Sequence, residues 1–431
     1  MKKVPVDMKI TTSDAAANLG GLPLQATVAM ADVAAAMREG LLAFSTAAGL
    51  VVMQQMLTAE LAGIVGDKHA KLGPDRVGNW HGSTRGQVVL GARKISVERP
   101  RGRYIDGGEI ELDTWATFAN EDLLRQVVVE RMLAGVATRR HVEVAEPVGQ
   151  TGTAVSRSAV SRRFVAATEA AMKEMLAADL SGLDTAVLMI DGLNVAGEMI
   201  VVALVITADG VKVPVGLRLG DTENIVVVKD LLADLVDRGL RFEHGILAVL
   251  DGSKALRRGV AKVFGTKALV QRCTLNKRRN VIGYLPEARR KGIDKRLAGI
   301  FANADAEAGL AEARRLAAQM RADYPDATGS LLEGLEEMFT VARLGITGGL
   351  RRSLTNTNCI ESMISTVRVV TGRVKKWENG DMKKRWIATG MIEAQRSFRR
   401  VRGHTQMANL VTIIGHAVNP ATPINYDQAV A

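Results

Sequence analysis

The 431-residue sequence is poor in several features that mark common classes of protein. It has only two cysteines, Cys273 and Cys359, too few for a disulfide scaffold and typical of a reducing compartment. No wholly apolar run reaches the roughly 18 residues of a membrane span, and the first residues contain no signal-peptide core. No glycine-rich nucleotide loop is present. These absences predict a cytoplasmic protein with no membrane partner and no nucleotide-driven chemistry.

The composition favours a large protein with a polyanionic partner. Lysine and arginine number 57 against 46 acidic residues, which gives a formal charge of +11 and a pI near 9.7. An excess of this sign favours nucleic acid. The hydrophobic fraction of 47% is enough for a substantial core, and the length predicts two to four domains.

The stretch Ala186–Gly192 predicts the centre of the fold. Its five apolar residues end in a carboxylate, so we expect a buried strand that delivers Asp191 to its end. Two strand-like runs follow at 199–207 and 211–217, and Asp209-Gly210 between them is a strong hairpin signal.

A helix and another acidic strand end follow. Residues 221–239 have helical spacing, and the apolar run 245–250 ends at Asp251. Two aspartates at the ends of neighbouring strands repel unless protonated or bridged by a cation, and hard oxygen ligands suit Mg²⁺ or Mn²⁺. The alternative is that both are turn residues, since Asp-Gly is common in loops.

A third carboxylate, Glu361, borders the apolar face of a helix over 355–368. Asn358 as N-cap with Glu361 three residues later also fits a capping box. However, residues 351–403 carry 13 basic against 4 acidic residues, an excess that a structural helix does not need and a DNA-facing one does. Arg368 lies two turns beyond Glu361 on the same side.

Further basic segments predict DNA contacts. Residues 156–164 begin with a serine and lead into a helix that resembles the recognition helix of a helix-turn-helix. A basic patch at 272–280 follows a fifth expected strand at 267–271. The residues expected to bind DNA are Arg157, Arg162, Arg163, Lys277, Arg278, Arg373, Lys375 and Lys376.

Together these motifs resemble the Mutator-type DDE transposases of bacterial insertion sequences, over about residues 41–403. Single pieces are weak signals, but their order along the chain is specific. The pieces are Ile190-Asp191-Gly192, Gly220–Asn224 with its helix to Gly239, Leu250–Ser253, Gln271–Cys273, Thr357–Ser362 and Arg385–Arg400.

The resemblance implies a multidomain α/β protein. Its ribonuclease H-like catalytic core is interrupted by an all-α insertion and preceded by a mainly helical DNA-binding region. The expected parts are a helical region 1–80, a β-rich segment 81–120, a helix-turn-helix-like region 121–182, the core 183–282 and 346–403, the insertion 283–345 and a tail 404–431.

The resemblance also implies a mechanism. Asp191, Asp251 and Glu361 become the metal-binding triad for two Mg²⁺ or Mn²⁺ ions, and Arg368 is the basic residue seven positions after the glutamate. The partners are double-stranded DNA, as terminal inverted repeats and target, and further copies in a dimer or higher multimer. Such an enzyme works in the bacterial cytoplasm, at the nucleoid.

One position departs from the family pattern. The family usually carries a Cys-x-x-His pair after the fifth strand, whereas this chain has Cys273 and Asn276. Both are expected beside the carboxylates as hydrogen-bonding partners rather than as zinc ligands. Two alternatives stay open: a catalytically impaired DNA-binding derivative, and another ribonuclease H-like nuclease. Asp221 and Glu223 are rival metal ligands if the strand register differs.

Overall fold

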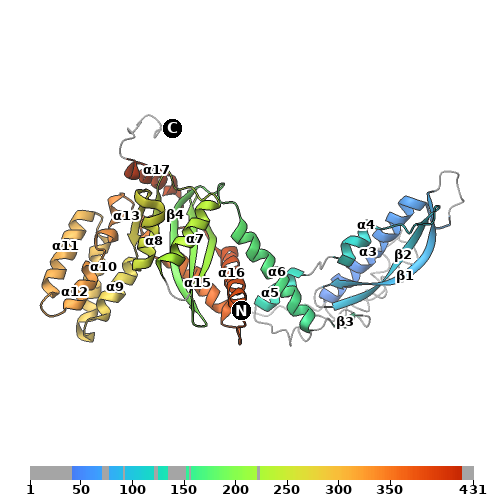
Figure 1. The fold of residues 1–431 in the computed structure, drawn as a ribbon, viewed down its shortest axis with the longest axis horizontal. Coiled ribbons are helices and arrows are strands. Elements are labelled where there is room, and N and C mark those ends of the chain that lie inside the picture. Colours follow the sequence, from blue (N-terminus) through green and yellow to red (C-terminus); the bar gives the residue numbers. More distant parts are fainter. Residues whose placement is uncertain are drawn as a thin grey trace, which may run out of the picture. The chain divides into compact units, whose positions relative to one another are not determined.

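The computed structural model describes residues 41–69, 77–90, 93–120, 125–133, 152–154, 157–220 and 224–419. The chain forms two compact units, Met1–Ala167 and Thr168–Ala431. Figure 1 shows a small sheet with helices in the first unit and a larger sheet covered by helices in the second. The predicted mixed α/β class is confirmed.

The first unit is built on a β-hairpin. Strands β1 (Gly78–Leu90) and β2 (Arg93–Tyr104) pair antiparallel, and β3 (Gly152–Ala154) pairs with β2. Helices α4 (Asp113–Asn120) and α5 (Arg125–Leu133) follow β2. The β-rich segment therefore begins a few residues before the expected boundary at residue 81 and ends in a helix.

Helix α3 (Leu41–Val65) packs on this hairpin. Its buried residues recur every four positions as Met53, Leu57, Leu61 and Val65. Helix α3 runs unbroken through Gly49. Ala47–Val65 is also long and apolar enough to cross a membrane by length and composition alone, which is weak evidence for a span.

Helix α6 (Arg157–Ala177) directly follows β3, apart from two undescribed residues. The expected helix-turn-helix needs a helix joined to α6 by a short turn. The described residues place a strand there instead, and residues 134–151 lie outside the description. The recognition-helix interpretation of α6 thus lacks its tight helical partner in the described part of the chain.

The second unit is centred on a five-stranded sheet with the order β6-β5-β4-β7-β8. Strands β4 (Thr185–Val195), β5 (Glu198–Thr207) and β6 (Lys212–Gly220) form an antiparallel meander. Strands β7 (Ile246–Leu250) and β8 (Ala268–Arg272) add in parallel to β4. The hairpin predicted at Asp209-Gly210 joins β5 and β6, with Gly210 at φ +81°.

Both faces of the sheet are covered. Helices α7 (Ile225–Asp237) and α8 (Lys254–Phe264) pack on one face, against side chains such as Leu188 and Leu250. Helices α14 (Gly348–Leu354), α15 (Asn358–Thr371), α16 (Gly380–Ser397) and α17 (Met407–Val418) cover the other, against side chains such as Met189 and Val249. The central strands are therefore apolar on both sides, as parallel sheets require.

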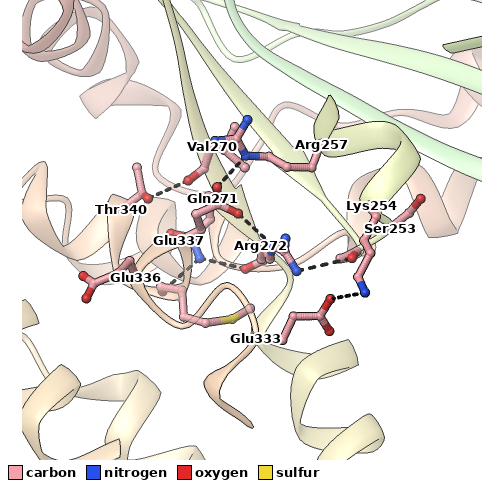
Figure 2. Close-up of polar contacts among 12 residues, drawn as sticks. Ser253, Lys254, Arg257, Val270, Gln271, Arg272, Glu333, Glu336, Glu337 and Thr340 are labelled. Atoms are coloured by element: carbon pink, nitrogen blue, oxygen red, sulfur yellow. Dashed lines mark hydrogen bonds and ion pairs between the residues drawn. The ribbon is translucent and has the colours of Figure 1, made fainter. Parts of the chain in front are cut away.

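The chain between β8 and α14 is helical wherever it has regular structure, and all of it is described. Its helices are α9 (Thr274–Gly283), α10 (Glu287–Ala302), α11 (Ala306–Met320), α12 (Pro325–Leu332) and α13 (Thr340–Arg343). They enclose a core of their own. A polar joint ties this group to β8 (Figure 2): Arg272 donates to Glu337 at 2.7 Å, and Thr340 donates to the carbonyl of Val270 at 2.6 Å.

Candidate catalytic site

Two aspartates lie side by side at the edge of the parallel part of the sheet. The sequence predicts a strand that ends at Asp191. Strand β4 instead continues to Val195, paired with β5. Its pairing with β7 stops at Ile190↔Leu250. Asp191, within β4, and Asp251, directly after β7, follow this last pair, and neighbouring strands are spaced about 4.8 Å apart.

The alternation of side chains along β4 assigns Asp191 to one face of the sheet. Val187, Met189 and Leu193 alternate with Leu188 and Ile190, and the odd positions belong to the core under α15. Because side chains alternate along a strand, Asp191 belongs to the same face. In β7, Val249 has the same orientation, and Asp251 follows two residues later, directly after the end of the strand.

Both aspartates are half-buried and anchored by the backbone. Oδ1 of Asp191 accepts from the amide of Gly192 at 2.8 Å, and Oδ1 of Asp251 accepts from the amide of Ser253 at 2.9 Å. The second bond closes an Asx turn at the start of α8. The turn interpretation of Asp251 is therefore correct for its backbone, and it leaves the second carboxylate oxygen of Asp251 without a partner among the described residues.

Glu361 lies in the first turn of α15, which covers the face with the aspartates. The capping-box interpretation is wrong, because the helix begins one residue earlier than it requires. Thr357 is the N-cap, Asn358 is the first helical residue, and Asn356 Oδ1 accepts from the amide of Asn358 at 2.9 Å. The Glu361 carboxylate instead accepts a side-chain hydrogen bond from Thr357.

A buried polar cluster holds one oxygen of Glu361. The Thr357 hydroxyl, which is fully buried, donates to Glu361 Oε1 at 2.7 Å. Asn276 Nδ2 lies 3.5 Å from both this hydroxyl and Oε1, and Cys273 Sγ lies 3.3 Å from the hydroxyl. The structure thus brings Cys273 and Asn276, from the start of α9, to Glu361. Oε2 of Glu361 accepts no hydrogen bond from the described residues.

The cluster has a direction. A hydroxyl has one proton, and the short contact to the carboxylate claims it. Thr357 therefore accepts from its other neighbours: the amide of Asn276 and the S–H of Cys273. Thr357 and Asn276 thus contact Oε1 of Glu361 directly, Cys273 contacts Thr357, and Oε2 stays available.

The chemistry of the site is that of hard oxygen donors. Asp191, Asp251 and Glu361 offer carboxylate oxygens, which suit Mg²⁺ or Mn²⁺ rather than zinc. Within the described ranges, no three histidine, cysteine, aspartate or glutamate side chains lie close enough together to hold a metal ion. The rival ligands Asp221 and Glu223 lie outside the described residues.

Two residues expected to bind DNA are already engaged within the protein. Lys277 is buried, and its Nζ donates to the carbonyls of Ser330 and Glu333 at 2.6 and 2.9 Å. Its assignment as a DNA contact is wrong, because the ammonium faces the C-terminal end of α12 rather than solvent. Arg278 makes a bidentate pair with Asp294 at 2.7 and 2.8 Å, which satisfies its charge.

The other predicted contacts differ in exposure. Arg368, Arg373, Lys375 and Lys376 are exposed at the end of α15 and in the loop to α16. Arg162 is exposed and Arg163 half-buried on α6, while the side chain of Arg157 lies outside the description.

The contact of Thr357 with Glu361 is not among the sequence-based predictions. Its signal was its position four residues before Glu361, which on a helix places the two side chains on one face. The motif was interpreted instead through Asn358.

The comparison with known families decides the identity. The sequence profile described as "Transposase, Mutator family" matches residues 25–400, which include every element of the site. The chain belongs to the Mutator family of transposases.

Individual relatives agree. The transposase is 24% identical over 346 residues to the "Transposase for insertion sequence element IS905" of Lactococcus lactis, which covers 78% of this chain and 85% of the relative. It is 29% identical over 175 residues to a "Probable transposase for insertion sequence element ISRM3-like" of Sinorhizobium fredii, covering 40% of this chain and 42% of that one. A Rhizobium meliloti relative, the "Transposase for insertion sequence element ISRM3", is 28% identical over a span of the same length.

Removal of the Thr357 hydroxyl should weaken the use of metal by this transposase. Thr357→Val keeps the shape but frees Glu361 Oε1, so we expect the Mg²⁺ concentration for half-maximal DNA cleavage to rise roughly 10-fold. Thr357→Ser should restore most of the loss. The matched control is Thr366→Val, because Thr366 donates only to the Ser362 carbonyl of the same helix. Equal Mg²⁺ dependence of Thr357→Val and Thr366→Val would contradict the assignment.

The buried Lys277 should make stability depend on pH. Burial lowers the pKa of Lys277 from 10.5 to about 8, so between these values the unfolded chain binds this proton and the folded protein releases it. The stability contributed by this group therefore rises with pH from about 8 to 10.5 and is constant below 8. Thermal unfolding of wild type and Lys277→Met across pH 7–10.5 should show this rise in wild type only; parallel profiles would rule it out.

Proposed function

We propose that this transposase binds the terminal inverted repeats of its insertion sequence and catalyses metal-dependent DNA strand cleavage and strand transfer. The observation that supports the proposal is the parallel pairing of β4 with β7 up to Ile190↔Leu250, directly before Asp191 and Asp251, with the helix of Glu361 packed on β4. Carboxylates carried by two neighbouring strands and by a helix packed on the same sheet are the donor type that phosphodiester chemistry with bound cations uses.

The sheet supports a ribonuclease H-like core. Its first three strands form an antiparallel meander, and the next two extend the sheet in parallel from the first strand. The helices α9–α13 enter between β8 and the helix of Glu361, which agrees with an all-α insertion before the last carboxylate. Similarity to the family had implied this arrangement.

Asp191, Asp251 and Glu361 would hold one or two Mg²⁺ or Mn²⁺ ions. The donors fit in chemical type, and Asp251 and Glu361 each keep an oxygen that no described residue uses. When bound, the metal would supply activation of a water or 3′-hydroxyl and charge stabilisation at the leaving oxygen. The protein's own part is to orient the carboxylates through Ser253, Thr357 and Asn276.

The exposed cations beside the site would contact the DNA backbone. Arg368 ends the helix of Glu361, and Arg373, Lys375 and Lys376 follow it in the loop. Among the described residues, no acidic side chain pairs with Arg373, Lys375 or Lys376, so their charges remain available to phosphate. Recognition of the repeat ends is proposed for the N-terminal unit, through Arg157, Arg162 and Arg163 on α6.

Each carboxylate should be essential for cleavage but not for binding. Each of three substitutions replaces one carboxylate with a neutral amide: Asp191→Asn, Asp251→Asn and Glu361→Gln. We expect each to lower the rates of cleavage and strand transfer of repeat-end DNA by roughly 10³-fold or more. Binding of the same DNA should stay near wild type in a gel-shift assay. A variant that still cuts at a near-normal rate would be excluded from the triad.

Assays of the wild-type protein also distinguish the proposed transposase function from the alternative of a non-catalytic DNA-binding derivative. If wild type binds repeat ends in Mg²⁺ and in Mn²⁺ yet cuts neither strand, the chain is a non-catalytic DNA-binding derivative, with Asn276 as the first residue to revert to histidine.

The exposed loop should account for part of the salt dependence of DNA binding. Lys376→Gln removes one phosphate contact, so the slope of log affinity against log salt should become shallower by about 0.9. Arg278→Gln is the matched control, because Arg278 is already paired with Asp294 and should leave the slope unchanged. Titrations from low to moderate salt measure both; equal slopes for wild type and Lys376→Gln would refute the contact.

A further inference from the structure

A polar cleft of about 810 Å³ lies between α9 and α12, with Lys254 of α8 on its rim. Its lining includes Arg279 and Asn280 from the C-terminal half of α9 and Tyr284 directly after that helix. It also includes Asp326 from α12 and Glu333 directly after α12. All these residues belong to the second unit of the chain. Nothing in the proposed reaction uses this cleft.

The cleft adjoins the candidate catalytic site along one face of α9. Asn276, Arg279, Asn280 and Gly283 follow the spacing i, i+3, i+4, i+7, which places them on one side of the helix. Asn276 contacts Glu361, and Arg279 donates to Asn276 Oδ1 at 3.2 Å. On the other side, Lys254 is three residues from Asp251. A DNA strand at the carboxylates therefore reaches the cleft within a nucleotide or two.

The lining suits a nucleotide better than a phosphate alone. Tyr284 is 58% exposed and offers a flat aromatic face, although large apolar side chains usually find cover. The carboxylates of Asp326 and Glu333 would repel a bare anion but accept from the amino groups of a base. The exposed cation Arg279 is on the same lining and suits its phosphate. Lys254 lies 3.4 Å from Glu333, so the rim is partly charge-neutral (Figure 2).

The floor of the cleft is firm and its interior is open. Lys277 donates from beneath to the carbonyls of Ser330 and Glu333, which line the cleft. A Cβ added at Gly283 or Gly329 would meet no atom within 4 Å. Both glycines are therefore places where a side chain could enter the cleft without displacing the protein.

We propose that the cleft receives one unstacked nucleotide of the DNA strand next to the scissile phosphodiester, with its base against Tyr284. This inference rests on the proposed cleavage function and adds a binding site to it. Base stacking on an aromatic side chain is worth enough to offset part of the cost of unstacking a base from the duplex. The captured nucleotide would fix the strand relative to Asp251 and Glu361.

Two variants test the cleft from opposite directions. Gly329→Leu fills it, and should leave the thermal unfolding midpoint unchanged or raised because leucine favours a helix over glycine. Its matched control is Gly292→Leu, an exposed glycine of α10 with equally open surroundings and no place in the cleft. Tyr284→Ala removes the aromatic face, and Tyr284→Phe keeps it.

The measurement uses repeat-end DNA with 2-aminopurine placed in turn at each position flanking the cleavage site. With Ca²⁺ in place of Mg²⁺, wild type should brighten one adjacent position several-fold as the base unstacks. Gly329→Leu and Tyr284→Ala should lose this signal and cut roughly tenfold more slowly in Mg²⁺, with repeat affinity within about twofold of wild type. Tyr284→Phe and Gly292→Leu should behave as wild type.

Three outcomes would overturn the proposal. If wild type cuts and Gly329→Leu and Tyr284→Ala match it in rate and fluorescence, the cleft binds no nucleotide. If these variants change the multimeric state but not the fluorescence, the cleft is a protein interface. If wild type neither cuts nor transfers repeat ends, the proposed function fails and the nucleotide site falls with it.

Discussion

The parallel pairing of β4 with β7 is the constraint on which the catalytic face depends. The register Ile190↔Leu250 makes Asp191 and Asp251 the next residues along the two paired segments, and the alternation of side chains assigns Asp191 to the layer under α15. A slip of one residue in β4 would move Asp191 to the opposite layer. Both faces of these strands are buried and apolar. A one-residue slip would therefore not expose apolar side chains to water, so the hydrophobic pattern alone does not prevent it.

The polar joint at the end of β8 extends this order into the helical insertion. Gln271 is fully buried, and its amide donates to the carbonyls of Arg272 and Met338 and accepts from the amide of Val341. Each buried polar group left without a hydrogen-bond partner lowers the free energy of unfolding by about 1–3 kcal/mol. Arg272 completes the joint by pairing with Glu337, with Gly334 at φ +63° close against its guanidinium. The insertion is thereby held at a fixed place beside the carboxylates.

The sequence was sufficient to predict the elements that local patterns encode. The strands around Asp191 and Asp251, the hairpin at Asp209-Gly210 and the α/β class all follow from apolar runs and turn residues, and the structure contains them. Contacts between distant segments were not predictable in this way. Strand β4 extends beyond its pairing with β7 because β5 continues to pair with it. The sequence pattern of residues 185–195 does not indicate this extension. Lys277 looked like part of a basic surface because its carbonyl partners lie more than 50 residues further along the chain. The predicted DNA contacts on α6 and the metal triad stay predictions.

Helix α9 places four consecutive residues in four different environments. Asn276 meets Glu361, Lys277 reaches the end of α12, Arg278 pairs with Asp294 on α10, and Arg279 borders the cleft. Each residue of a helix is turned about 100° from the one before. Substitution at any of the four disturbs one neighbour, whereas the insertion or deletion of a single residue would rotate the rest of the helix away from all of its partners at once. The length of α9 should therefore vary far less over evolutionary time than its amino-acid composition.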